Sequence, residues 1–166
     1  MRTIIFLLAL NIFCFFTGGC ALLGSNENKV QHAENYQLVP PENWKVAKPR
    51  GECDHAYELP SGNTVSVTSS CDRSRDANLK TLTRQLLIGL RQIKVIEESE
   101  MPLSQGSGLF THLQASSEGT PLVLGLAVVK MMGCVFDFSL VSKKSLSSAE
   151  KKDFLKLVKS LRYGND

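Results

Sequence analysis

Hydrophobic and polar residues follow three different patterns along the chain. Residues 4 to 16 are almost entirely apolar, residues 24 to 35 are polar without an apolar period, and strand and helix patterns begin at Tyr36. A polar stretch without periodicity is typical of a solvated linker. The folded domain is therefore predicted to begin at Tyr36, where two prolines force an extended entry and Trp44 supplies the first large core side chain.

A β-hairpin is predicted next. Residues 56 to 59 and 64 to 68 are short runs with β-branched or aromatic side chains, and the Gly and Asn between them supply the positive φ that tight turns require. The expected turn registers place Cys53 opposite Ser70 or Cys71. Facing cysteines can form a bridge in a compartment where disulfides persist. We therefore predict a disulfide between Cys53 and Cys71.

The same cysteines permit a second chemistry. Thiolate and imidazole ligands suit zinc, so Cys53, His55 and Cys71 form an alternative metal site, although a fourth protein ligand is missing from the pattern. A redox-active pair is disfavoured because the C-x-x-C spacing of thiol oxidoreductases is absent. His32 stands alone in the polar stretch and is predicted to be solvated. We predict no cofactor.

An amphipathic helix is predicted after the hairpin, with Asp76 as a candidate N-cap. Large apolar residues recur at intervals of three and four and form one stripe: Leu79, Leu82, Leu86, Leu90 and Ile93. Five basic residues lie on its outer face or just before it: Arg73, Arg75, Lys80, Arg84 and Arg91. They are a candidate patch for anionic headgroups or an acidic partner, and an ordinary solvated face is the alternative interpretation.

A strand beginning at Val95 and a three-stranded antiparallel meander are predicted after this helix. Residues 109 to 115, 122 to 129 and 132 to 140 alternate between apolar and other residues, with turn residues between them. Cys134 lies on the apolar face of the last strand, so we predict that it is a small buried core residue.

The last element is a helix. Ser147 and Glu150 have the spacing of a capping box, and Gly164 is the predicted stop. The apolar stripe of this helix is Phe154, Leu157, Val158 and Leu161. Two helices that interrupt a mainly antiparallel sheet predict an α+β sandwich.

This order of elements resembles the PsbP-like superfamily, named for an extrinsic subunit of photosystem II and also containing a yeast nuclear-import regulator and several bacterial lipoproteins. The shared marks are Pro41 with Trp44 at the opening, a leucine-rich helix after the first hairpin, and the terminal helix of residues 154 to 162. The resemblance covers residues 36 to 163. It implies an α/β/α sandwich and a binding role as an assembly factor or extrinsic subunit, without catalysis.

The apolar run at the start of the chain is followed by Thr17, two glycines and Cys20. Its length of about a dozen residues suits a signal peptide better than a membrane span of about 20. The pattern resembles the lipobox of bacterial lipoproteins, in which the chain is cut before the cysteine and the cysteine is acylated. Thr17 departs from the usual Leu at that place. An uncleaved anchor that extends to Leu23 is the alternative.

These predictions divide the chain into a signal peptide at 1–19, a lipidated Cys20 with a linker to residue 35, one domain at 36–163 and a tail at 164–166. The net charge of +3 falls when Arg2 is removed, which is too nearly neutral to favour nucleic acid binding.

Together, the patterns predict a lipoprotein with palmitate on Cys20 that faces the periplasm and serves as a non-catalytic binding or envelope-assembly module for an envelope protein. The sequence has no evident constellation of acid, base and nucleophile. Ala21 is not the Asp that marks inner-membrane retention in enteric bacteria, which favours the outer membrane. The alternative is a metal-binding or thiol-dependent envelope protein that uses Cys53, His55 and Cys71.

Overall fold

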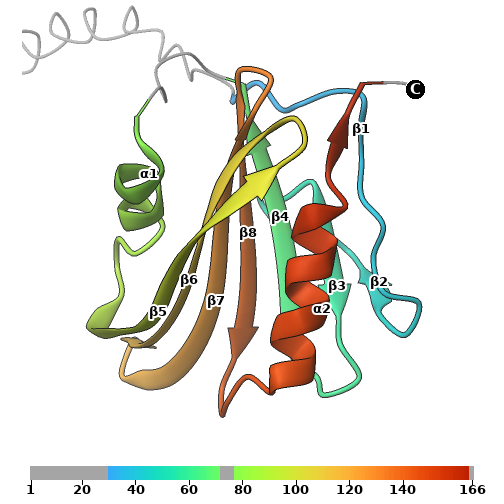
Figure 1. Ribbon diagram of the computed structural model, residues 1–166. Coiled ribbons are helices and arrows are strands. Elements are labelled where there is room, and N and C mark those ends of the chain that lie inside the picture. The colour runs from blue at the N-terminus through green and yellow to red at the C-terminus, as the bar shows by residue number, and fades with distance from the viewer. Residues whose placement is uncertain (1–29, 72–76, 165–166) are drawn as a thin grey trace, which may run out of the picture.

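The computed structural model describes residues 30–71 and 77–164, which form a seven-stranded antiparallel sheet with a helix on each face (Figure 1). The predicted α+β architecture with two helices is therefore confirmed. Cys20, Arg73, Arg75 and Asp76 lie outside the described residues. In the described part of the chain, no helix is long and apolar enough to cross a membrane.

The elements follow one another in a simple order. The strands of the large sheet are β2 (Lys45–Ala47), β3 (His55–Glu58), β4 (Thr64–Ser70), β5 (Arg91–Leu103), β6 (Gly106–Ser117), β7 (Thr120–Met131) and β8 (Cys134–Ser142). The helices are α1 (Leu79–Gln85) and α2 (Ser148–Lys159). Two short strands, β1 (Tyr36–Gln37) and β9 (Arg162–Tyr163), pair separately from the large sheet.

The strand order across the large sheet is β2-β3-β4-β8-β7-β6-β5. After β4 the chain passes through α1 to the far edge, where β5 begins, and then returns strand by strand until β8 pairs with β4 (Figure 1). The predicted meander of β6, β7 and β8 is confirmed, and so is the hairpin of β3 and β4. This return path makes β8 the second neighbour of β4.

The larger core lies between α2 and the sheet. Phe154 of α2 is fully buried, and its ring centroid lies 6.2 Å from that of Phe110 on β6. Trp44 is buried as predicted and contacts Tyr57 with 6.0 Å between ring centroids.

The C-terminal helix begins as predicted and ends earlier. The capping box of Ser147 and Glu150 is present. The C-cap is Ser160, so the predicted role of Gly164 as the helix stop is wrong. The helix ends early because residues 162 and 163 are needed as β9, which pairs with β1.

The predicted long helix after the hairpin is wrong in its second half. α1 has only 7 residues, and its N-cap is Asn78, whose side chain accepts a hydrogen bond from the Thr81 amide. Gly89 has a φ of 89°, which ends any helical path, and Ile93 lies in β5. The leucine spacing was misleading because Leu86 and Leu90 pack on the same sheet face as α1 while following turns rather than a helix.

Candidate functional site

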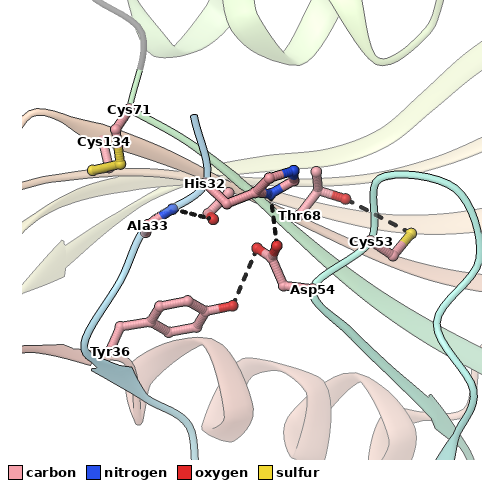
Figure 2. A network of polar contacts seen from close by, with 9 residues as sticks. His32, Ala33, Tyr36, Cys53, Asp54, Thr68, Cys71 and Cys134 are labelled. Carbon is pink, nitrogen blue, oxygen red and sulfur yellow. Dashed lines mark hydrogen bonds and ion pairs between the residues drawn. A yellow bond between two sulfur atoms is a disulfide. The ribbon is translucent and has the colours of Figure 1, made fainter. Parts of the chain in front are cut away.

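A disulfide joins Cys71 at the end of β4 to Cys134 at the start of β8 (Figure 2). In the register of these strands Ser70 pairs with Val135, so the next two positions face each other. The predicted disulfide between Cys53 and Cys71 is therefore wrong. Cys134 is buried as predicted, but it is a bridged residue rather than a free core thiol.

The error comes from the register and from the missing neighbour of β4. Tyr57 pairs with Val65, and continuing that register places Cys53 opposite Ser69 instead of Cys71. The second neighbour of β4 is β8, which comes much later in the chain. Hairpin spacing alone says nothing about that second neighbour.

Cys53 is a free, half-buried thiol. Its Sγ accepts a hydrogen bond from Thr68 Oγ1 at 3.8 Å. Within the described residues, no group of three or more His, Cys, Asp or Glu side chains is arranged to hold a metal ion. Because Cys71 is bridged and His55 packs beside the rings of Tyr36 and Tyr57, the alternative metal site of Cys53, His55 and Cys71 is also wrong.

Asp54 is the centre of a polar network that ties the N-terminal segment to the sheet (Figure 2). One carboxylate oxygen, Oδ1, lies 2.7 Å from His32 Nδ1 in an ion-pair contact. The other, Oδ2, accepts a hydrogen bond from the Tyr36 hydroxyl at 3.2 Å. The prediction that His32 is solvated in a linker is therefore wrong.

The electrostatics of this network keep Tyr36 as a donor. Burial, then the negative charge of Asp54 and the hydrogen bond to it, raise the pKa of the Tyr36 hydroxyl well above its ordinary value. The Tyr36 ring also packs edge-on against Phe136 with 5.0 Å between centroids. A hydroxyl that stays protonated and packed in this way holds Asp54 in place and is not available as a base.

Thiol catalysis needs a nucleophile within hydrogen-bond reach of a base. In the described structure His32 contacts Asp54, while the Cys53 thiol contacts Thr68. The network therefore lacks the contact that would activate the thiol. The contacts of the network are structural: they join residues that are far apart in the sequence.

Backbone groups add two hydrogen bonds between the N-terminal segment and the end of β4. The Cys71 amide donates to the Gln31 carbonyl at 2.8 Å, and the Ala33 amide donates to Ser69 Oγ at 2.8 Å. Two residues of the predicted linker, Gln31 and Ala33, are thus hydrogen-bonded to the end of β4. These contacts could not be predicted from the sequence, because they use backbone groups and polar side chains that follow no period.

The predicted basic patch is not gathered on one helix face. Lys80 and Arg84 are exposed on α1, but Arg91 is the first residue of β5. Lys80 Nζ is already 3.2 Å from Glu98 Oε1. The three described members of the patch therefore lie on two elements, and one of them is paired.

A different surface feature was missed from the sequence. Four large apolar residues are exposed within nine positions, one in the connection before the edge strand β5 and three on β5, and we call them the apolar edge: Ile88, Ile93, Val95 and Ile96. In the described sheet β5 pairs only with β6, and its register is irregular on either side of Lys94. Because Arg91 pairs with Ser116, the apolar edge begins near the β6–β7 turn.

Comparisons with known proteins bear on the fold. No protein-family model matches the chain, and no curated protein matches its sequence. The solution structure of cyanobacterial PsbP (CyanoP) from Synechocystis sp. PCC 6803 matches with a TM-score of 0.57 and 14% identity, covering 89% of this chain and 98% of that chain. The chain has a PsbP-like fold. The resemblance seen in the sequence is thus confirmed for the fold.

Two further solved structures are similar. A crystal structure from Bacteroides thetaiotaomicron VPI-5482 matches with a TM-score of 0.55 and 14% identity over 79% of this chain and 46% of that chain. LpqN of Mycobacterium tuberculosis, described as involved in cell envelope biogenesis, matches with a TM-score of 0.49 and 14% identity over 75% of this chain and 78% of that chain. At these identities, function is argued from this chain's own residues.

Proposed function

We propose that the protein is a membrane-anchored bacterial lipoprotein whose PsbP-like domain is a non-catalytic binding module of the cell envelope. Its anchor is Cys20, whose thiol is diacylated before residues 1–19 are removed and which then becomes the lipidated first residue. The small residues before Cys20 support this assignment. Because Ala21 follows the cysteine, we assign the anchor to the outer membrane, and density-gradient separation of the two membranes tests that assignment.

The observation that carries this function is that the anchor side and the apolar edge lie at opposite ends of the sheet. Gln31 is hydrogen-bonded to Cys71, and Cys71 is bridged to Cys134, so the first described residues lie beside the β7–β8 turn. The α1–β5 connection, which leads into the apolar edge, lies at the other end (Figure 1). An anchored domain therefore holds the start of this edge away from the bilayer.

Lengths favour a protein rather than lipid at the apolar edge. Gln31 follows Cys20 by 11 positions, which span at most about 40 Å when fully extended. β7 has 12 residues and is itself about 40 Å long. The far end would reach the headgroups only if the connection were stretched along the whole domain. Exposed apolar side chains held in this way are typical of a protein interaction site.

Site-specific photo-cross-linking in the native envelope tests this function. A benzophenone amino acid replaces Ile88 of the acylated protein, and the control replaces Val46, since both side chains are 82% exposed but Val46 lies on β2 at the other sheet edge. We expect a discrete protein adduct from position 88 that is absent from position 46. Ile96→Glu should reduce that adduct at least tenfold without changing the circular dichroism spectrum. Identical adduct patterns from the two positions would contradict a binding role for the apolar edge.

A further inference from the structure

The β7–β8 turn has an unusual residue for its conformation. Met132 and Gly133 form a two-residue turn between the paired residues Met131 and Cys134, and both have positive φ, 51° and 78°. Turns of this kind favour Asn or Asp followed by Gly, because a Cβ crowds the backbone in the left-handed region and the short polar side chains of Asn and Asp offset that cost by local hydrogen bonds. A methionine at the first position is therefore not explained by the needs of the turn.

Packing within the domain does not explain Met132 either. Its side chain is 68% exposed, whereas that of the preceding Met131 is 2% exposed. Met131 is thus part of the core, whereas the side chain of Met132 faces solvent. A strained backbone that carries an exposed apolar side chain suggests a contact outside the domain.

The position of this turn indicates what it contacts. Two residues after Met132, Cys134 is bonded to Cys71, and the Cys71 amide is bonded to Gln31. The start of β8, beside the turn, is therefore connected to Gln31 through one disulfide and one hydrogen bond. The β7–β8 turn and the start of the blue segment before β1 lie at the same end of the molecule (Figure 1), and the disulfide holds β8 beside Cys71, which is hydrogen-bonded to Gln31.

We infer that the β7–β8 turn docks on the lipid bilayer, with the Met132 side chain entering the boundary between headgroups and acyl chains. This inference rests on the proposed lipid anchor at Cys20. One methionine is too small to hold a protein on a membrane, but an anchor keeps the turn at a high local concentration near the lipid. The contact therefore orients an anchored domain and directs the apolar edge away from the surface.

Fluorescence quenching gives a direct test. Trp44 is the only tryptophan of the chain and is buried, so a second tryptophan can report on its own surroundings. Acylated Met132→Trp protein is reconstituted in vesicles of phosphatidylethanolamine and phosphatidylglycerol with brominated acyl chains, and Ile88→Trp is the matched exposed control. We expect the added emission of Met132→Trp to be quenched by at least half and that of Ile88→Trp to be unchanged. Equal quenching of the two variants, or none of Met132→Trp, would overturn the inference.

Oxidation of the native side chain provides a test without substitution in the turn. Hydrogen peroxide converts exposed methionine to the sulfoxide, and the buried Met101 and Met131 serve as internal references. In the same vesicles, Met132 of the acylated protein should oxidise at least fivefold more slowly than Met132 of a lipid-free chain that begins at Ala21. Equal rates would contradict the inference, and so would protection that occurs only in native envelopes, which would indicate a protein contact.

The two proposals fail in different ways. The intact mass of each sample shows whether Cys20 is acylated. An acylated protein whose Met132 is neither quenched as Trp nor protected from peroxide refutes the docked turn and leaves the anchor standing. A protein without lipid at Cys20 refutes the anchor itself.

Discussion

Glu150 joins the start of α2 to the β3–β4 turn. Its Oε2 accepts hydrogen bonds from the Ser147 amide and hydroxyl at 2.8 and 2.6 Å, and its Oε1 accepts from Ser61 Oγ and Asn63 Nδ2, both at 2.6 Å. Burial alone would raise the pKa of the Glu150 carboxyl, but the hydrogen bonds, led by that from Ser147, outweigh burial and lower the pKa to about 2. The ionised form is therefore the one that the fold stabilises.

This pKa predicts a defined pH dependence. The folded pKa lies below the ordinary value of 4.5, so the contribution of Glu150 is complete above pH 4.5 and is lost as the pH falls towards 2. In urea unfolding, Glu150→Gln should be less stable than the wild type at pH 7, and its stability should fall less between pH 4.5 and 2. Glu42→Gln, at an exposed loop position, should follow the wild type. Parallel curves for Glu150→Gln and the wild type would show that the carboxylate is not clamped.

Among the elements, the disulfide joins the end of β4, which precedes α1, to the start of β8, the last strand of the large sheet. Cys71 and Cys134 are 63 positions apart, and closing a loop of that length removes about 4 kcal/mol of unfolded-chain entropy. The bridge also lies beside the hydrogen bonds that Gln31 and Ala33 make with the end of β4, so it stabilises both the centre of the sheet and the first described residues.

We expect the double variant Cys71→Ser and Cys134→Ser to lose about 2–5 kcal/mol of unfolding free energy. Cys53→Ser is the control, since its thiol is free, and it should change the unfolding free energy by less than about 1 kcal/mol. Denaturant unfolding with and without reductant measures both. The bridge assignment fails if non-reducing peptide mapping finds Cys53 bonded to Cys71, or if reduction leaves the stability of the wild type unchanged.

Elements with strong local signals were predictable from the sequence. The β3–β4 hairpin has its turn residues, the meander has its alternation, and α2 has both a capping box and a continuous stripe. α1 was overestimated because leucines on turns can face the same core as leucines on a helix. The positive φ of Gly89 is incompatible with a helix that continues to Ile93.

At the scale of the whole molecule, what the sequence could not give is which distant segments meet. The pairing of β4 with β8 determines the disulfide, and the hydrogen bonds of Gln31 and Ala33 to the end of β4 determine where the first described residues lie. Both depend on contacts between residues far apart in sequence, which no local period encodes. The predicted pair of hairpin cysteines is therefore absent from the described structure, in which Cys71 is bridged to Cys134 of β8.

This arrangement gives the proposed function a direction. One end of the sheet carries the fastened segment, the disulfide and the exposed Met132. The apolar edge begins at the other end, in the α1–β5 connection, and continues on β5, which has a single described neighbour. With an anchor at Cys20, the disulfide end would face the membrane and the end where the apolar edge begins would face a partner. The proposed function therefore requires acylation of Cys20.

Intact-mass spectrometry of the protein purified from the membrane fraction tests the anchor most directly. We predict a chain that begins at Cys20 and carries a diacylglyceryl group on its thiol and an acyl group on its amino terminus, with both groups absent from Cys20→Ala. A chain that retains residues 1–19 with an unmodified Cys20, or one cut elsewhere and free of lipid, would contradict the anchored module.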